Sequence, residues 1–262
     1  KEFGRITTQN ARNVILQKIR EEERKVLYDQ YYGMEKEVVT GIVQRVMGKN
    51  VSVNLGKADG ILSENEQVKG EEFEPTERIK VYILEVKDTP KGPRILLSRT
   101  HPGLVKRLFE SEVAEVKDGT VEIKSIAREA GSRTKIAVWS NDPDVDPVGA
   151  CVGMNGARVN SIVEELRGEK IDIINWDENP AILIENALSP AKVISVMADP
   201  DEKTALVVVP DYQLSLAIGK EGQNARLAAR LTGFKIDIKS ETQARESGEL
   251  YDYDDEDEYY DE

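Results

Sequence analysis

An internal repeat in the second half of the chain limits the folds open to these 262 residues more than any other feature. The tetrapeptide Gly153-Met154-Asn155-Gly156 recurs 66 positions later as Gly219-Lys220-Glu221-Gly222. After a one-residue slip, the pattern Leu-x-Gly-x-Lys-Ile-Asp-Ile at 166–173 recurs at 231–238. Because chance rarely preserves such a spacing, we infer two copies of one structural unit in series.

Each copy has the same predicted order of elements: helix, two strands, helix, glycine loop, helix, strand. The corresponding segments are strands at 135–139 and 205–209, short apolar helices at 148–152 and 214–218, and amphipathic helices at 157–166 and 223–231. A lone Gly-x-x-Gly is a weak signal of function, but here each loop joins two helices and precedes a Lys-Ile-Asp-Ile strand. The duplicated unit resembles the K-homology (KH) domain of the prokaryotic type, type II.

The chemistry of such a loop favours phosphate. Glycine permits backbone torsions and a close approach that a Cβ would forbid, and the helix that follows begins with unpaired N–H groups and a positive dipole end. About four nucleotides of single-stranded RNA can then lie along the groove, with their bases on an aliphatic floor.

The candidate RNA-binding residues are the two loops, the helix starts after them and the following strands. In the first copy they are Gly153, Met154, Asn155, Gly156, Arg158, Val159, Ile171 and Ile173. In the second they are Gly219, Lys220, Glu221, Gly222, Gln223, Asn224, Arg226, Arg230, Lys235 and Ile236.

The two loops differ in charge. Four cations in the second copy, at positions 220, 226, 230 and 235, face only one anion, Glu221, and we expect this copy to hold phosphates more strongly. Met154 and Asn155 give the first loop hydrogen-bonding capacity and contact area instead of charge. The alternatives stay open that Arg226 and Arg230 form a solvated helix face and that the isoleucines belong to the sheet core.

Residues 33–100 have a different sequence pattern, in which short β-branched runs are separated by Gly, Asn, Asp and Pro. Predicted strands cover 38–46, 51–55, 60–62, 78–86 and 95–98. Five strands in this length fit a small closed barrel of the oligonucleotide-binding (OB) type. The segment resembles an S1 RNA-binding domain, although it offers only Tyr82 and Phe73 as aromatic platforms, so we expect a modest contribution to binding.

Residues 1–32 predict a long helix, capped at Thr7 or Thr8 and ending near Tyr32, whose narrow apolar stripe suits a strut between domains. The missing initiator Met suggests a piece of a longer protein. At the other end, residues 241–262 carry eleven acidic side chains and one basic side chain, so most of the net charge of −13 lies there. We predict a disordered acidic tail, either a solubiliser or a nucleic-acid mimic.

Composition removes several function classes. The chain has one Cys, Cys151, and one His, His101, which is too few for a disulfide, for an ordinary zinc site or for most nucleophilic relays. We therefore expect no enzyme activity, no cofactor and no metal. No apolar run reaches the roughly 18 residues of a membrane span, so we expect a cytoplasmic protein without a membrane partner.

The whole arrangement resembles the NusA family of bacterial transcription elongation factors. The most specific segments are 3–6, Leu96-Leu97-Ser98-Arg99-Thr100, and Gln223-Asn224-Ala225-Arg226-Leu227-Ala228. The resemblance implies a multidomain α+β protein with a connecting helix (1–32), an S1 domain (33–100), two KH domains (101–178 and 179–240) and the tail (241–262).

The resemblance also implies a function and partners. It implies a non-enzymatic factor that holds single-stranded nascent RNA along a continuous S1–KH–KH surface and modulates pausing, termination and antitermination. RNA polymerase would be bound mainly through N-terminal residues that precede this chain, other elongation factors are possible partners, and the protein would be a monomer. Two alternatives remain at this point: a ribosome-associated or RNA-decay-associated RNA-binding protein, and a protein-interaction scaffold whose KH units do not bind RNA.

Overall fold

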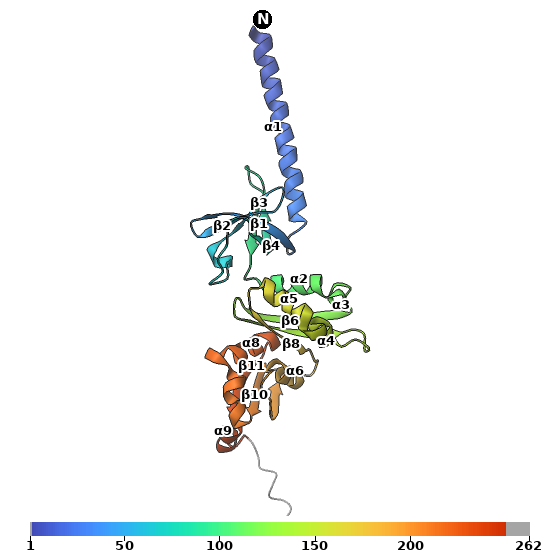
Figure 1. Ribbon diagram of the computed structural model, residues 1–262, viewed down its shortest axis with the longest axis vertical. Helices are drawn as coiled ribbons and strands as arrows, with labels where there is room; N and C mark the ends of the chain where they lie inside the picture. Colours follow the sequence, from blue (N-terminus) through green and yellow to red (C-terminus); the bar gives the residue numbers. More distant parts are fainter. Residues whose placement is uncertain (1, 250–262) are drawn as a thin grey trace, which may run out of the picture. The chain divides into compact units, whose positions relative to one another are not determined.

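The computed structural model describes residues 2–249, which divide into two compact units (Figure 1). The first unit contains the residues up to 108 together with 165–167. The second contains 109–164 and the residues from 168 onward. Because each unit has its own core, we describe each by itself.

The first unit begins with the long helix α1 (Glu2–Tyr32). The sequence-based N-cap was wrong, since the helix already exists before Thr8, whose Oγ1 donates to the Gly4 carbonyl one turn back at 2.7 Å. Helical propensity across several charged residues outweighs the local preference of threonine for a cap. Tyr31 anchors the end of the helix, since it is buried and its hydroxyl donates to the Leu55 carbonyl at 3.1 Å.

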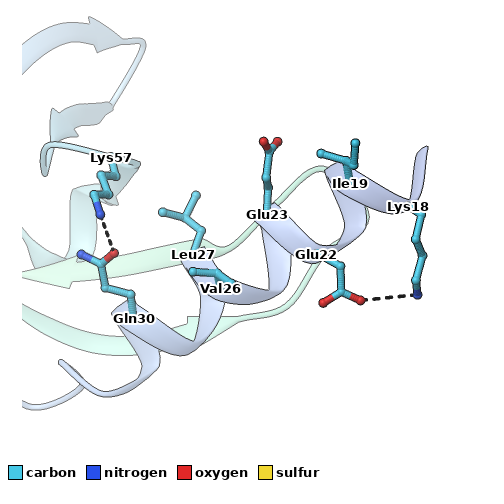
Figure 2. Close-up of a pocket in the computed structure, with 8 residues that line it drawn as sticks. All are labelled: Lys18, Ile19, Glu22, Glu23, Val26, Leu27, Gln30 and Lys57. Atoms are coloured by element: carbon cyan, nitrogen blue, oxygen red, sulfur yellow. Dashed lines mark hydrogen bonds and ion pairs between the residues drawn. The ribbon is translucent and has the colours of Figure 1, made fainter. Parts of the chain in front are cut away.

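Much of α1 carries exposed apolar side chains. Val14, Ile15 and Val26 are exposed. Figure 2 shows Ile19, Val26 and Leu27 along the stretch of α1 that leads to the barrel, where Lys57 Nζ donates to Gln30 Oε1 at 3.3 Å. The helix is thus fixed to the barrel at its C-terminal end, while its apolar stripe has no covering layer among the described residues.

The predicted β-module is a closed five-stranded barrel with the order β1-β2-β3-β5-β4. Its strands are β1 (Val38–Met47), β2 (Asn50–Asn54), β3 (Asp59–Leu62), β4 (Arg78–Lys87) and β5 (Arg94–Ser98), with a 3-10 turn η1 (Glu64–Glu66). Parallel pairing of β3 with β5 closes the ring. Gly41 is required inside it, because a Cβ there would lie 2.3 Å from Val53 Cγ1. The barrel prediction is confirmed.

The two aromatic platforms expected on the barrel both have partners. The Tyr82 ring is only 7% exposed and stacks on the His101 ring, with 4.6 Å between centroids. The Arg167 guanidinium lies over Phe73 at 5.1 Å. Neither ring is therefore a free surface for a base.

The two predicted repeats lie mostly in the second unit, while residues 101–108 and 165–167 of the first copy belong to the first unit. The first copy comprises α2 (Pro102–Glu112), α3 (Ala114–Lys117), β6 (Val121–Glu129), β7 (Arg133–Ser140), α4 (Pro147–Val152), η2 (Met154–Gly156), α5 (Ala157–Glu165) and β8 (Lys170–Asn175). The second comprises α6 (Pro180–Ala187), β9 (Ser195–Asp199), β10 (Thr204–Val209), η3 (Asp211–Gln213), α7 (Leu214–Ile218), η4 (Lys220–Gly222), α8 (Gln223–Thr232), β11 (Lys235–Ser240) and α9 (Glu241–Glu246). In each sheet the middle strand pairs antiparallel with the strand before it and parallel with the strand after the loop helix.

One hydrophobic core joins the two repeats. Ala127, Ala137 and Ile174 of the first copy belong to the same buried cluster as Leu183, Leu227 and other residues of the second. Helix α8 contacts β6 and β7, so the helix that follows the second glycine loop packs on the sheet of the first copy. The two copies therefore form one body.

The tail prediction needs a correction. Residues 241–249, expected to be disordered, include helix α9, which begins with a capping box at Ser240 and buries Ala244. Glu249 pairs with Lys239 at 2.5 Å. Burial of an alanine and a reciprocal cap offset the acidic composition of this segment. Residues 250–262 lie outside the described part of the chain.

A buried ion pair in the first unit gives a test of the fold. The Arg99 guanidinium is 1% exposed and makes two 2.8 Å contacts to Glu71 and a 2.7 Å contact to the Lys80 carbonyl. Replacing Glu71 by Ala leaves this charge without its main partner, so we expect a loss of about 3–5 kcal/mol in the free energy of unfolding. Urea titration followed by circular dichroism measures it. The control is Glu72→Ala at the exposed neighbouring position. Equally small losses of unfolding free energy in the two variants would contradict Glu71 as the main partner of Arg99.

Candidate nucleic-acid interface

The two glycine loops have nearly identical backbones. The first glycine has φ 76° in one loop and 77° in the other, and the last has 76° and 74°. The third position is left-handed in both, at Asn155 (φ 52°) and Glu221 (φ 54°). A Cβ on Gly153 would lie 2.7 Å from Arg158 Cγ, and one on Gly219 would lie 2.8 Å from Asn224 Cβ. Torsion and close approach together therefore require glycine at the first position.

Each loop presents a short 3-10 turn to solvent. Met154 is 84% exposed, and Lys220 and Glu221 are also exposed. The first N–H groups of a turn have no partner within it, and they lie at the positive end of the helix that follows. The loops thus offer donors for an anion, as the sequence predicted, while the ligand itself remains a matter of proposal.

Two predicted RNA-binding side chains instead brace the loops. Arg158 Nη1 donates to the Ala150 carbonyl at 2.7 Å and pairs with Glu115 at 2.9 Å. Asn224, at the equivalent position, is 5% exposed, and its Nδ2 donates to the carbonyls of Ala217 and Leu188 at 2.9 and 3.0 Å. Both side chains hold the loop to the helix before it, so their first role is structural, and a contact of either with RNA stays a prediction.

Arg226 also has hydrogen-bond partners within the protein. Its Nε and Nη2 form a bidentate contact to Glu129 of the first KH copy, and its Nη1 donates to the Glu221 carbonyl at 3.1 Å. Gln223 adds contacts to Glu129 at 2.8 Å and Ser132 at 2.7 Å. We call this contact of Arg226 and Gln223 with Glu129, which links the two copies, the Glu129 clamp. A phosphate contact of Arg226, whose side chain is 42% exposed, stays a prediction. Arg230 lies 3.8 Å from Glu129 and stays more than half exposed.

Aliphatic side chains line part of a cavity that residues of both copies build. This cavity of about 540 Å³ lies between Val148 of α4 and Ile173 of β8, and α6 and the linker after it complete its wall. Ile171 is half-buried, as are Val159 and Ile236. Ile236 packs on the common core, so its first role is structural.

A second cavity, of about 360 Å³, lies at the second loop. It is lined by Leu216, Gly219, Lys220, Gln223 and Asn224 of the second copy and by Ser132, Arg133, Lys170 and Pro190. Lys235 does not line it, because the ten residues of α8 separate it from the loop by roughly 15 Å. The sequence-based grouping of Lys235 with Lys220 was therefore misleading.

Sequence reasoning missed Glu129, Ser132, Arg133 and Lys170, which belong to the other copy. Only Lys170 had a usable signal, since it is the repeat equivalent of Lys235. Cys151 is buried, and burial raises the pKa of its thiol to about 11, which makes it a poor nucleophile at neutral pH.

Within residues 2–249 no three His, Cys, Asp or Glu side chains are grouped in a way that could hold a metal ion. In the same part of the chain no helix has both the length and the apolar character to cross a membrane.

The fold and the loops define a protein of the S1 and tandem-KH class. Family models agree: "S1 RNA binding domain" matches residues 33–98, "NusA-like first KH domain" 99–176, "NusA-like second KH domain" 180–246 and "NusA N-terminal domain" 1–25.

Three curated relatives share the name "Transcription termination/antitermination protein NusA". The Bacillus subtilis protein is 60% identical over 248 residues, which cover 95% of this chain and 67% of the relative. The Mycobacterium tuberculosis protein is 50% identical (91% and 72% covered) and the Thermus thermophilus protein 47% identical (90% and 61%). The chain belongs to the NusA family of transcription termination/antitermination proteins and spans about two thirds of the length of these relatives.

The Glu129 clamp predicts a pH effect. The hydrogen bond from Arg226 lowers the pKa of Glu129 below its usual value, although burial opposes it. A carboxyl whose pKa is lower folded than unfolded contributes stability above its unfolded pKa of about 4.3, and this is lost as the pH falls through the folded pKa. Glu129→Gln should therefore lower the melting temperature at pH 7, with a difference from wild type that shrinks below about pH 4. Calorimetry across pH measures this, and a constant difference would contradict it.

Proposed function

We propose that this chain binds single-stranded RNA along the surface of its two KH domains and thereby serves as the RNA-holding part of a transcription termination/antitermination factor. The observation that carries the proposal is that one body with a common core presents both glycine loops, with one cavity at the second loop and another beside helix α4, which leads into the first loop. Two loops fixed relative to each other lose less orientational freedom on binding one strand than two tethered loops do.

Strand β8 gives the RNA a path between the two cavities. Its first residue, Lys170, lines the cavity at the second loop, and Ile173 lines the cavity in the first copy. Three residues of strand span roughly 10 Å, a distance that one extended polynucleotide bridges easily. Residues 189–191 form the rim between the cavities, with Pro190 on one side and Ser189 and Ala191 on the other.

The two cavities differ in a way that suits different parts of a nucleotide. Aliphatic side chains such as Val148 and Ile173 line part of the first and give bases an apolar surface, while polar side chains such as Glu185 line the rest. The second has three cationic side chains in its lining, Arg133, Lys170 and Lys220, which suit the backbone. We therefore assign base contacts mainly to the first cavity and phosphate contacts mainly to the second.

The charge difference between the loops gives a direct test. Lys220→Asp with Glu221→Asp should weaken RNA binding more than Met154→Asp with Asn155→Asp, because only the first pair of changes removes a cation. Aspartate tolerates the left-handed third position of each loop, so both variants should fold. Loss of one cation at a phosphate predicts a drop of roughly three- to tenfold at low salt.

Fluorescence anisotropy with a short labelled RNA measures the affinities, and circular dichroism checks the fold of each variant. Equal losses from the two pairs of changes would contradict the charge argument. No binding of any single-stranded RNA by the wild-type chain at low salt would refute the proposed function and favour the scaffold alternative.

We infer further that the protein acts in the cytoplasm as a non-enzymatic monomer and that RNA polymerase is its protein partner, with other elongation factors as additional candidates. The relatives' name supports a role in transcription, and residues 1–25 match the NusA N-terminal domain. The exposed apolar residues of α1 lie largely in this matched segment, so we assign polymerase association to the N-terminal region. We place the domain limits near 32, 100 and 178, with α9 added to the second KH domain.

A further inference from the structure

The cavity at the second glycine loop is built by both KH copies. From the second copy come the loop residues Gly219 and Lys220 and the first residues of α8. From the first copy come Ser132 and Arg133, at the turn into β7, and Lys170, at the start of β8. Arg133 and Lys170 are register partners in the parallel pairing of β7 with β8, so the sheet fixes them side by side.

The walls of this cavity are held by contacts that cross between the copies. Gln223 Nε2 donates to Ser132 Oγ at 2.7 Å and to Glu129 at 2.8 Å, and both of these partners belong to the first copy. Within the second copy, Asn224 Nδ2 donates to the Leu188 carbonyl at 3.0 Å and so fixes the start of α8. A cavity whose two walls are hydrogen-bonded to each other keeps its shape, which is what a preorganised site needs.

The internal repeat provides a built-in comparison. Lys170 and Lys235 occupy the same position of the repeat, each is the first residue of its strand, and both are exposed. Lys170 lines the cavity at the second loop, whereas Lys235 lies at the far end of α8. Equivalent sequence positions therefore have different surroundings, because no third copy follows to place a loop against Lys235 among the described residues.

The cationic side chains at the cavity differ in whether they already have an ion-pair partner. Arg133 pairs with Asp172 at 3.0 Å. Across residues 2–249, neither Lys170 nor Lys220 has an ion-pair partner. Two hydrated ammonium groups face one small cavity next to the positive end of α8, and like charges held this way attract an anion.

We propose that Lys170 of the first KH domain completes a phosphate site at the glycine loop of the second, so that one RNA backbone phosphate is held jointly by Lys170, Lys220 and the loop amides where the strand crosses from one domain to the other. This rests on the proposed function. Its consequence is that the second domain's site is incomplete without the first, although the second domain carries its own Gly-x-x-Gly loop.

The experiment compares Lys170→Ala with its repeat control, Lys235→Ala, in the full chain. Anisotropy is measured with an RNA of roughly eight to twelve nucleotides, since each KH groove takes about four. Lys170→Ala should weaken binding roughly three- to tenfold at low salt and make the slope of log K against log salt shallower by about 0.7, the value for one phosphate contact on a single strand. Lys235→Ala should change neither.

Two further measurements separate this site from general charge effects. Lys170→Arg keeps the cation and should restore most of the affinity, while an unchanged circular dichroism melt shows that the fold is intact. An RNA of about four nucleotides, too short to occupy both grooves, should show a smaller effect of Lys170→Ala.

The outcomes are distinguishable. If the wild-type chain binds RNA and Lys170→Ala and Lys235→Ala lose affinity equally, the joint site is refuted and the proposed function stands. The same conclusion holds if neither variant loses affinity. Absence of RNA binding by the wild-type chain removes both. The joint site is also refuted if Lys170→Ala lowers the RNA affinity without making the salt slope shallower, because a phosphate contact must release counterions.

Discussion

The contact on which the rest of the second unit depends is the packing of α8 onto the sheet of the preceding copy. This helix follows the second glycine loop, and it meets β6 and β7 through a common apolar core and through the Glu129 clamp. Because the helix is fixed at both its apolar face and its charged side, the loop at its start has a defined position relative to the first copy. The two loops are therefore held in one body, and residues of both copies meet at the cavity beside the second loop.

The arginines and lysines of this chain have different roles. Arg99, Arg158 and Arg226 all make forked or multiple contacts to carboxylates and carbonyls of the protein. The planar guanidinium suits such fixed geometry, and its bidentate bonds hold long-range contacts in place. Lys170 and Lys220 instead remain exposed point charges at the cavity. A flexible ammonium adapts to a sliding phosphate chain better than a fork that needs one orientation.

The sequence predicted the parts that depend on local patterns. Alternating β-branched runs predicted the barrel, and the duplicated glycine loop predicted both KH copies with nearly correct helix and strand limits, because torsional requirements and periodicity act within a few residues. The roles of Arg158, Asn224 and Arg226 could not be predicted in the same way. Their partners lie up to 97 residues away in the chain, at Glu129 in the case of Arg226, so a count of charges in one segment overestimates what is free to bind a ligand.

An acidic chain can still offer a cationic site, and the arrangement of charges explains how. The sequence carries a net charge of −13, yet eleven of its acidic residues lie after position 240. Within the second unit, Glu115, Glu129 and Glu169 pair with arginines and so contribute little field at a distance. What reaches a ligand at the junction is the field of the unpaired lysines and of the helix end, over a range limited by the Debye length of about 10 Å at moderate salt. Under the proposed function, RNA binding depends on which charges are left unpaired near the loops, and the total charge of the chain is a poor guide to it.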